Sequence, residues 1–136
     1  MITAVDSNVL LDILGANPTF GPASAKGLRT ATQQGRLVVC EVVWAEVAAW
    51  FTTAEAAGAA LRRFELEFSA LTMEAALEAG IAWRAYRERG GARTRVTADF
   101  LIGAHALCQA DRLLSRDRGF YRSYFKRLSV FDPSNS

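Results

Sequence analysis

Four carboxylates stand where an α/β domain would bring them together. Asp6 directly follows a short apolar run, and Asp117 comes two residues after another. Asp99 lies in the first turn of a helical pattern, and Glu46 lies one turn into a different one. In open α/β sheets, ligands bind beyond the carboxyl ends of the strands. We therefore expect these four side chains to gather at one edge of a sheet.

A cluster of carboxylates calls for a cation. Like charges about 4 Å apart repel one another by several kcal/mol at a protein-like effective dielectric constant. Mg²⁺, or Mn²⁺ in its place, takes carboxylate and water oxygens as ligands. Such an ion lowers the pKa of a bound water and neutralises charge at a phosphorus atom under attack. The pattern therefore favours metal-dependent hydrolysis of a phosphate ester.

Each carboxylate also has a simpler structural explanation. Asp6 and Asp117 are each placed to cap a following helix, and Asp99 would complement the dipole of its own helix. Glu46 could be an ordinary solvent-facing helix residue. The conjunction of the four, rather than any one of them, carries the catalytic hypothesis.

The elements that must position these carboxylates follow from the hydrophobic pattern. Strands are expected at 2–5, 37–40, 69–73, 112–115 and 128–131, and helices at 7–14, 23–34, 41–51, 54–68, 74–89 and 98–110. This alternation predicts an α/β domain whose mainly parallel central sheet has about five strands flanked by helices. We expect a single domain over residues 1–132 and a short disordered tail over 133–136. Leu77, Ile81, Trp83 and Tyr86 are the expected buried face of the helix at 74–89.

Length and composition exclude several protein classes. The chain has 136 residues, of which 51% are hydrophobic, and its net charge is +2, so a disordered chain is not expected. No apolar run approaches the roughly 20 residues of a membrane span. Cys40 and Cys108 sit in apolar runs without metal-ligand spacing, which disfavours zinc and disulfides. We expect a cytoplasmic protein that does not associate with membranes.

Basic residues concentrate in the second half of the chain. Residues 84–127 carry 11 basic and four acidic side chains. This imbalance suggests a polyanionic partner, although a solvated arginine-rich surface explains it equally well. Arg93 and Arg95, in a loop that follows two glycines, and Arg116 and Arg118, which flank a candidate carboxylate, are the expected phosphate contacts.

Other common catalytic arrangements are not supported. The single histidine, His105, lies within an apolar helical stretch, where a packed role is expected. One histidine completes no convincing Ser–His–acid or Cys–His arrangement. The sequence contains neither a GxxxxGK[ST] motif nor a GxGxxG motif after a strand, so P-loop nucleotide hydrolysis and dinucleotide binding are unsupported.

Four motifs in order give the sequence a family resemblance. They are VDSNVLL at 5–11, VWAEV at 43–47, DFLIGAHA at 99–106 and LSRDRGF at 114–120. Together they resemble the motifs of PIN-domain ribonucleases and, within them, of the VapC-type toxins of toxin–antitoxin pairs. The resemblance covers nearly the whole chain and implies a PIN-like fold.

The resemblance also implies roles for particular residues. It makes Asp6, Glu46, Asp99 and Asp117 the catalytic acids, the three aspartates the ligands of Mg²⁺ or Mn²⁺, and Asn8 and Ser115 supporting polar groups. The implied activity is Mg²⁺-dependent endoribonucleolytic cleavage of an RNA such as tRNA or rRNA by a metal-activated water. The implied partners are a VapB-type antitoxin and a second copy of the chain.

We expect the antitoxin to dock a helix in an apolar groove. The aromatic residues available for that groove are Trp44, Trp50, Phe51, Phe64 and Phe68.

Two other functions remain open at this point. One is a PIN-like module with weak or no catalysis that binds RNA or a protein, which the complete set of four acids disfavours. The other is a metal-dependent phosphatase. Its commonest form carries a DxDx[TV] signature, whereas Asp6 here is followed by Ser7 and Asn8.

Overall fold

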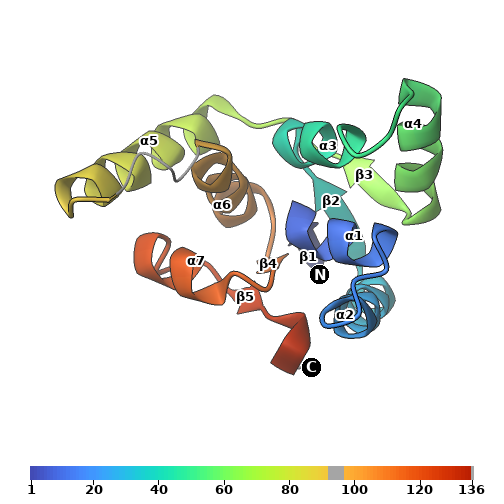
Figure 1. The fold of residues 1–136 in the computed structure, drawn as a ribbon. Coiled ribbons are helices and arrows are strands. Elements are labelled where there is room, and N and C mark those ends of the chain that lie inside the picture. The colour runs from blue at the N-terminus through green and yellow to red at the C-terminus, as the bar shows by residue number, and fades with distance from the viewer. Residues whose placement is uncertain (92–96, 136) are drawn as a thin grey trace.

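Five strands lie in the middle of the fold, with helices on both sides of them (Figure 1). The computed structural model describes residues 1–91 and 97–135. The strands are β1 (Ile2–Val5), β2 (Arg36–Val39), β3 (Leu66–Phe68), β4 (Arg112–Leu114) and β5 (Val130–Phe131). The helices are α1 (Ser7–Leu14), α2 (Gly21–Gln34), α3 (Glu41–Ala48), α4 (Ala54–Arg63), α5 (Met73–Glu88), α6 (Thr97–Gln109), α7 (Arg118–Tyr124) and the 3₁₀ helix η1 (Pro133–Asn135).

The strands form one sheet in the order β3-β2-β1-β4-β5, and every neighbouring pair is parallel. The expected α/β fold with a mainly parallel sheet is therefore confirmed. In the central strand, Thr3 pairs with Leu37 of β2 on one side and with Arg112 of β4 on the other. Because all strands run the same way, the residues that follow β1 and β4 emerge side by side at one edge of the sheet.

The sheet is covered on both faces, as parallel sheets usually are. Thr3, Ala4 and Val5 of β1 are all buried. In Figure 1, α5 and α6 lie on one side of the strands, and α1 and α2 lie on the other. Two helix starts are capped by threonine side chains, since Thr53 Oγ1 accepts a hydrogen bond from Ala56 N and Thr72 Oγ1 accepts one from Ala75 N.

The prediction for residues 54–73 was wrong in its second half. The helix ends at Arg63 rather than Phe68, and the third strand is Leu66–Phe68 rather than residues 69–73. Glu65 adopts a left-handed backbone conformation, with φ of 58°, and this turns the chain out of the helix. The strand is then held at the sheet edge by its pairing with β2, where Arg36 Nε donates to Glu67 Oε2 at 2.7 Å.

The buried face of α5 also differs from the expected one. Ala75, Ala79 and Ala82 are the buried residues of this helix, whereas Leu77 and Ile81 are 64% and 66% exposed. The small alanine side chains allow α5 to pack closely on α6, and Leu77 and Ile81 face outward, whereas Tyr86 packs against the core as predicted and Trp83 stacks on Phe100 of α6.

Several other boundaries differ from the sequence-based prediction, most of them by one or two residues. The helix that begins at Glu41 ends at Ala48 rather than at residue 51, and β5 is limited to Val130–Phe131. The expected disordered tail instead begins with η1, in which Pro133 is buried. Gly27 explains this contact, because its missing side chain leaves room for Pro133 against α2. Within residues 1–91 and 97–135, no helix combines the length and apolar character that crossing a membrane requires.

Candidate active site

Asp6 lies at the centre of a polar cluster at the carboxyl edge of the sheet. It follows β1 and is only 3% exposed. Its Oδ2 atom accepts hydrogen bonds from Ser115 Oγ at 2.8 Å and from Tyr121 Oη at 2.9 Å. Its backbone N–H donates to Leu114 O at 3.0 Å, which ties the first residue after β1 to the end of β4. The parallel pairing of the two central strands therefore builds this cluster.

Burial raises the pKa of the Asp6 carboxyl to about 6. The negative charge of Asp99 raises it further, while the hydrogen bonds from Ser115 and Tyr121 lower it. The cluster therefore holds a negative charge that the surrounding protein does not fully compensate, and a bound cation would stabilise the ionised carboxylate.

The charges of three of the four predicted acids act on one phenol. The pKa of Tyr121 is raised well above its ordinary value, mainly by burial and then by the charges of Asp6, Asp99 and Asp117. Tyr121 therefore stays protonated and acts as a hydrogen-bond donor. Asp117 is tied to the cluster through its backbone N–H, which donates to Ser115 Oγ at 3.0 Å.

Glu46, the fourth acid, joins the cluster through a hydroxyl. Ser7 Oγ donates to Glu46 Oε1 at 2.8 Å and lies 3.5 Å from Asp6 Oδ1. Glu46 itself is exposed on α3, so its carboxylate borders the buried part of the site.

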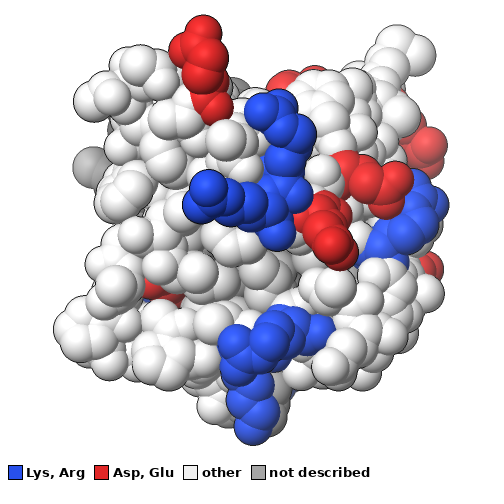
Figure 2. Space-filling model, turned by 90° about the vertical axis from the view of Figure 1, so that its right-hand side faces the viewer, with Lys and Arg blue, Asp and Glu red and all other residues white. Residues whose placement is uncertain are grey.

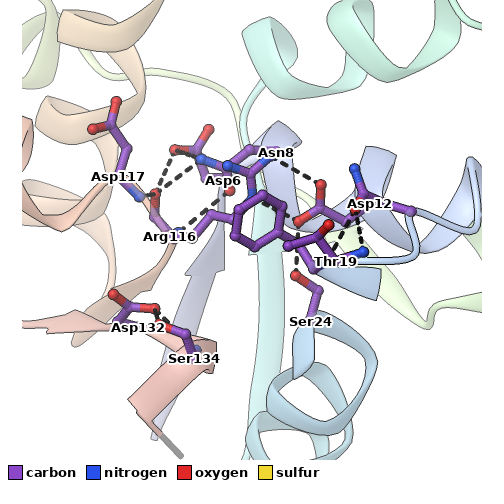
Figure 3. Close-up of polar contacts among 12 residues, drawn as sticks. Asp6, Asn8, Asp12, Thr19, Ser24, Arg116, Asp117, Asp132 and Ser134 are labelled. Atoms are coloured by element: carbon purple, nitrogen blue, oxygen red, sulfur yellow. Dashed lines mark hydrogen bonds and ion pairs between the residues drawn. The ribbon is translucent and has the colours of Figure 1, made fainter. Parts of the chain in front are cut away.

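The two predicted supporting residues both contact the cluster. Asn8 Nδ2 lies 3.3 Å from Ser115 Oγ and 3.5 Å from Asp6 Oδ2. Figure 3 shows Asn8 and Asp6 close together at the start of α1, with Asp117 on the neighbouring turn. Ser115 is fully buried and bridges Asp6 and Asp117.

The carboxylates do not form a closed metal cage. Among the side chains of the described residues, no group of three or more His, Cys, Asp or Glu lies close enough together to hold a metal ion. The donor chemistry nevertheless fits a hard divalent cation, because carboxylate and hydroxyl oxygens are the groups that converge here. The raised pKa of Asp6 points the same way.

The predicted phosphate contacts differ in their surroundings. Arg93 and Arg95 lie outside the described residues. Arg116 directs its guanidinium to Asp12 of α1, with Nε 2.7 Å from Asp12 Oδ2. Arg118, the first residue of α7, has a buried Nε for which the described chain offers no hydrogen-bond partner.

Sequence reasoning missed three residues of this region. Ser7 and Tyr121 contact the acids, and Asp12 pairs with Arg116. Tyr121 could have been found from its spacing, because it follows Asp117 by four residues and so lies on the same side of α7. Asp12 could have been singled out as a carboxylate within an apolar helix, and Ser7 from its place beside Asp6 in the VDSNVLL motif.

His105 has the packed role that the sequence predicts. It is buried in α6, and its Nε2 lies 3.0 Å from Ser69 Oγ. Burial lowers the pKa of His105, so the ring is neutral near pH 7.

Fold and site together define an α/β domain with an acidic site at the carboxyl edge of a parallel sheet. A sequence model of the PIN domain matches residues 3–126. The chain belongs to the PIN domain family, whose members are generally nucleases. No curated protein sequence gives a significant match.

Several solved structures share this fold at low sequence identity. A chain of VapBC2 from Rickettsia felis, bound to a DNA fragment from the promoter, matches with a TM-score of 0.75 at 18% identity, covering 96% of this chain and 98% of that one. VapBC-1 from nontypeable Haemophilus influenzae gives a TM-score of 0.75 at 19% identity, with 98% and 99% covered. FitAcB from Neisseria gonorrhoeae gives 0.70 at 18% identity, with both chains fully covered.

Proposed function

We propose that this protein is a Mg²⁺-dependent endoribonuclease and the toxin of a VapBC-type toxin–antitoxin pair. The observation that carries the proposal is that the charges of Asp6, Asp99 and Asp117 all act on Tyr121, which donates to Asp6 at the edge of the sheet where parallel α/β folds bind ligands. Membership of the PIN domain family supports nuclease activity. The fold shared with VapBC structures supports the toxin assignment.

Asp6, Asp99 and Asp117 would hold the divalent cation, with Glu46 as a further acid at the rim. When bound, Mg²⁺ or Mn²⁺ supplies an activated water and positive charge at the scissile phosphate. Ser115 and Tyr121 fix the Asp6 carboxylate by donating to the same oxygen. That leaves Oδ1 of Asp6 for another partner, with Ser7 Oγ 3.5 Å away.

RNA would reach this acidic site across basic side chains. Arg118 is the described residue proposed to contact phosphate, because it begins α7 directly after Asp117. Arg93 and Arg95, just before α6, remain proposed contacts on the grounds of sequence alone. Whether the RNA is tRNA or rRNA, and the expected cytoplasmic location, stay predictions.

An antitoxin helix could dock between α2 and the end of α4. A pocket of about 410 Å³ there is lined by Ile13, Leu28 and Phe64 among other residues. Figure 2 shows the side of the molecule on which α2 and α4 lie, where uncharged surface separates an upper from a lower group of basic side chains and acidic side chains lie beside the upper group. Of the five aromatic residues expected in a groove, Phe64 is the one that lines this pocket. An apolar helix with acidic flanks would suit it.

A second copy of the chain could pack on α5. Met73, Leu77 and Ile81 follow one another at four-residue intervals and are 79%, 64% and 66% exposed, so they form an apolar stripe along this helix. The first half of α5 carries two glutamates and its second half carries two arginines before the final glutamate. Antiparallel pairing of two copies places each acidic half opposite a basic half.

The decisive test is RNA cleavage by the purified protein with EDTA and with Mg²⁺ restored. We expect cleavage only with the metal, and a loss of roughly 100-fold in the Asp99→Asn variant, since a metal ligand is removed. Glu55→Gln, which neutralises an exposed acid in the first turn of α4, is the matched control and should cleave normally. Undiminished cleavage in EDTA would rule out the metal mechanism.

The same assay separates the other two functions. RNA that is bound but left intact with every divalent metal would indicate a binding module without catalysis. Metal-dependent hydrolysis of a phosphomonoester, with RNA untouched, would indicate a phosphatase.

A further inference from the structure

Arg116 turns away from the carboxylates beside it. It lies between Ser115 and Asp117, yet its guanidinium reaches across to α1 (Figure 3). There Nε donates to Asp12 Oδ2 at 2.7 Å and Nη2 donates to Asp12 Oδ1 at 3.0 Å. This two-point geometry fixes the orientation of both groups, which a single contact does not.

Asp12 is built to receive this arginine. Its side chain is 4% exposed, and its Oδ2 also accepts a hydrogen bond from Ser24 Oγ of α2 at 2.9 Å. A carboxylate this buried is costly to ionise without a cation, and Arg116 supplies one. Arg116 thus compensates a charge that lies outside the acidic cluster.

The aromatic ring of Phe20 packs against the Arg116 guanidinium. The Arg116 guanidinium carbon lies 4.1 Å from the centre of the Phe20 ring, within the range of a cation–π contact. Phe20 is held in place in turn, because its backbone N–H donates to Asn17 Oδ1 at 2.9 Å. The loop between α1 and α2 therefore completes the seat of the guanidinium.

The restraint on Arg116 passes directly to the site. The neighbouring Ser115 Oγ donates to Asp6 and accepts from Asp117 N. The backbone N–H of Arg116 itself points to Asn8 Oδ1 at 3.5 Å. Because Arg116 is anchored to α1, its neighbours Ser115 and Asp117 are held in place as well.

We propose that Arg116 is a positioning residue, which locks the β4–α7 turn onto α1 through Asp12 so that Asp117 faces Asp6, and that it does not bind the RNA phosphate. The inference deepens the proposed function and rests on it for the role of Asp117. It reassigns Arg116 from the group of phosphate contacts that the sequence suggests. It also gives Asp12 a role in the site, although its carboxylate faces the other way.

Mn²⁺ binding to the RNA-free protein, measured by calorimetry, tests this role. We expect Asp12→Asn and Arg116→Ala each to weaken Mn²⁺ binding about 10-fold, as loss of groups that orient a ligand does. The double variant should lose no more than either single variant, because both remove the same contact. Arg116→Lys keeps the positive charge but cannot make the two-point contact with Asp12, so we expect its Mn²⁺ binding to stay close to that of Arg116→Ala. Arg36→Ala, which breaks the exposed pair with Glu67, should leave Mn²⁺ binding unchanged.

A second measurement does not depend on metal. In EDTA, the amide hydrogen of Asp117 should exchange at least several-fold faster in Asp12→Asn than in the wild type, because its acceptor Ser115 is no longer held. Unchanged exchange in Asp12→Asn would overturn the proposal, whether or not the protein binds Mn²⁺. The proposal would also be overturned if Arg116→Ala weakened RNA binding and reduced its salt dependence while Mn²⁺ binding stayed unchanged. Failure of the wild type to bind Mn²⁺ would instead count against the proposed function.

Discussion

The Asp6 carboxyl is nearly inaccessible to water, yet two hydroxyl groups donate to a single one of its oxygens. Burial favours its neutral form, and the donors favour its charged form. Burial prevails, so the pKa is raised to about 6. Near neutral pH the folded protein thus carries an ionised group in a place that disfavours it, which is a destabilising arrangement expected of a functional site.

This balance predicts how stability depends on pH. The pKa of Asp6 is about 6 in the folded protein and near 3.8 in the unfolded chain, so the folded state binds more protons between these values. The stabilising effect of protonation is complete below about pH 4 and is lost as pH rises through 6. It amounts to about 3 kcal/mol of unfolding free energy.

Urea unfolding in EDTA from pH 4 to pH 7.5 measures this effect. Relative to Asp6→Asn, the wild type should lose stability across that range, because the variant does not titrate. Parallel curves for the two proteins would contradict the raised pKa.

At the residue level, the sequence was informative about acids and less so about their partners. Asp6, Asp99 and Asp117 stand out because each follows or begins a recognisable element. Tyr121 has a sequence signal in its four-residue spacing from Asp117, and Asp12 has one in its place within an apolar helix. Their partners could not be predicted, because the contacts depend on how α7 and α1 pack. The direction of the Arg116 side chain was unpredictable for the same reason, since its partner lies 104 residues away.

At the level of elements, packing overrode local pattern in two places. The sequence-based prediction placed Leu66 and Phe68, which alternate with polar residues, in a helix. In the structure the left-handed backbone of Glu65 ends the helix, and residues 66–68 pair with β2 as an edge strand. In α5, Leu77 and Ile81 were expected inside, but alanines occupy the buried positions of the helix, and Leu77 and Ile81 are exposed. Hydrophobic periodicity predicts neither result, because it indicates that an element has an apolar side but does not show which element packs against that side.

The contact between α6 and α7 gives a prediction at this scale. A methyl group on Gly103 of α6 would lie 2.5 Å from the ring of Phe125, which is itself buried. Gly103→Ala should therefore cost about 1–3 kcal/mol of unfolding free energy through overpacking. Gly119→Ala in α7 is the matched control, since no atom of the described chain lies within 4 Å of the added carbon. It should be neutral or stabilise by up to about 1 kcal/mol. Thermal unfolding of both variants checks this, and equal losses would contradict it.

For the whole molecule, the α/β class and the parallel sheet were predictable from the order of elements. Apolar runs alternating with helices leave few other arrangements. The order of the strands within the sheet was beyond the reach of such a prediction, because nothing in a strand of three or four apolar residues identifies its neighbours.

The apolar stripe on α5 predicts the state of association. Leu77→Asp places a charge in the middle of that stripe and should convert a dimer into a monomer, because the charge would be buried between two copies. Sedimentation of the wild type and the variant measures this. Glu55→Asp, an exposed change on α4, is the control. A wild type that sediments as a monomer at micromolar concentration would contradict the proposed dimer.

The pairing of β1 with β4 has a consequence for the order in which the chain is made. Ser115 and Tyr121, the two donors to Asp6, follow it by 109 and 115 residues. At a synthesis rate of roughly 5–20 residues per second, the nascent chain carries Asp6 without these partners for roughly 5–23 s. The contacts around Asp6 therefore form only after residue 121 has been translated. For the proposed nuclease, a nascent chain shorter than this lacks one or both of the two hydroxyl groups that hold Asp6.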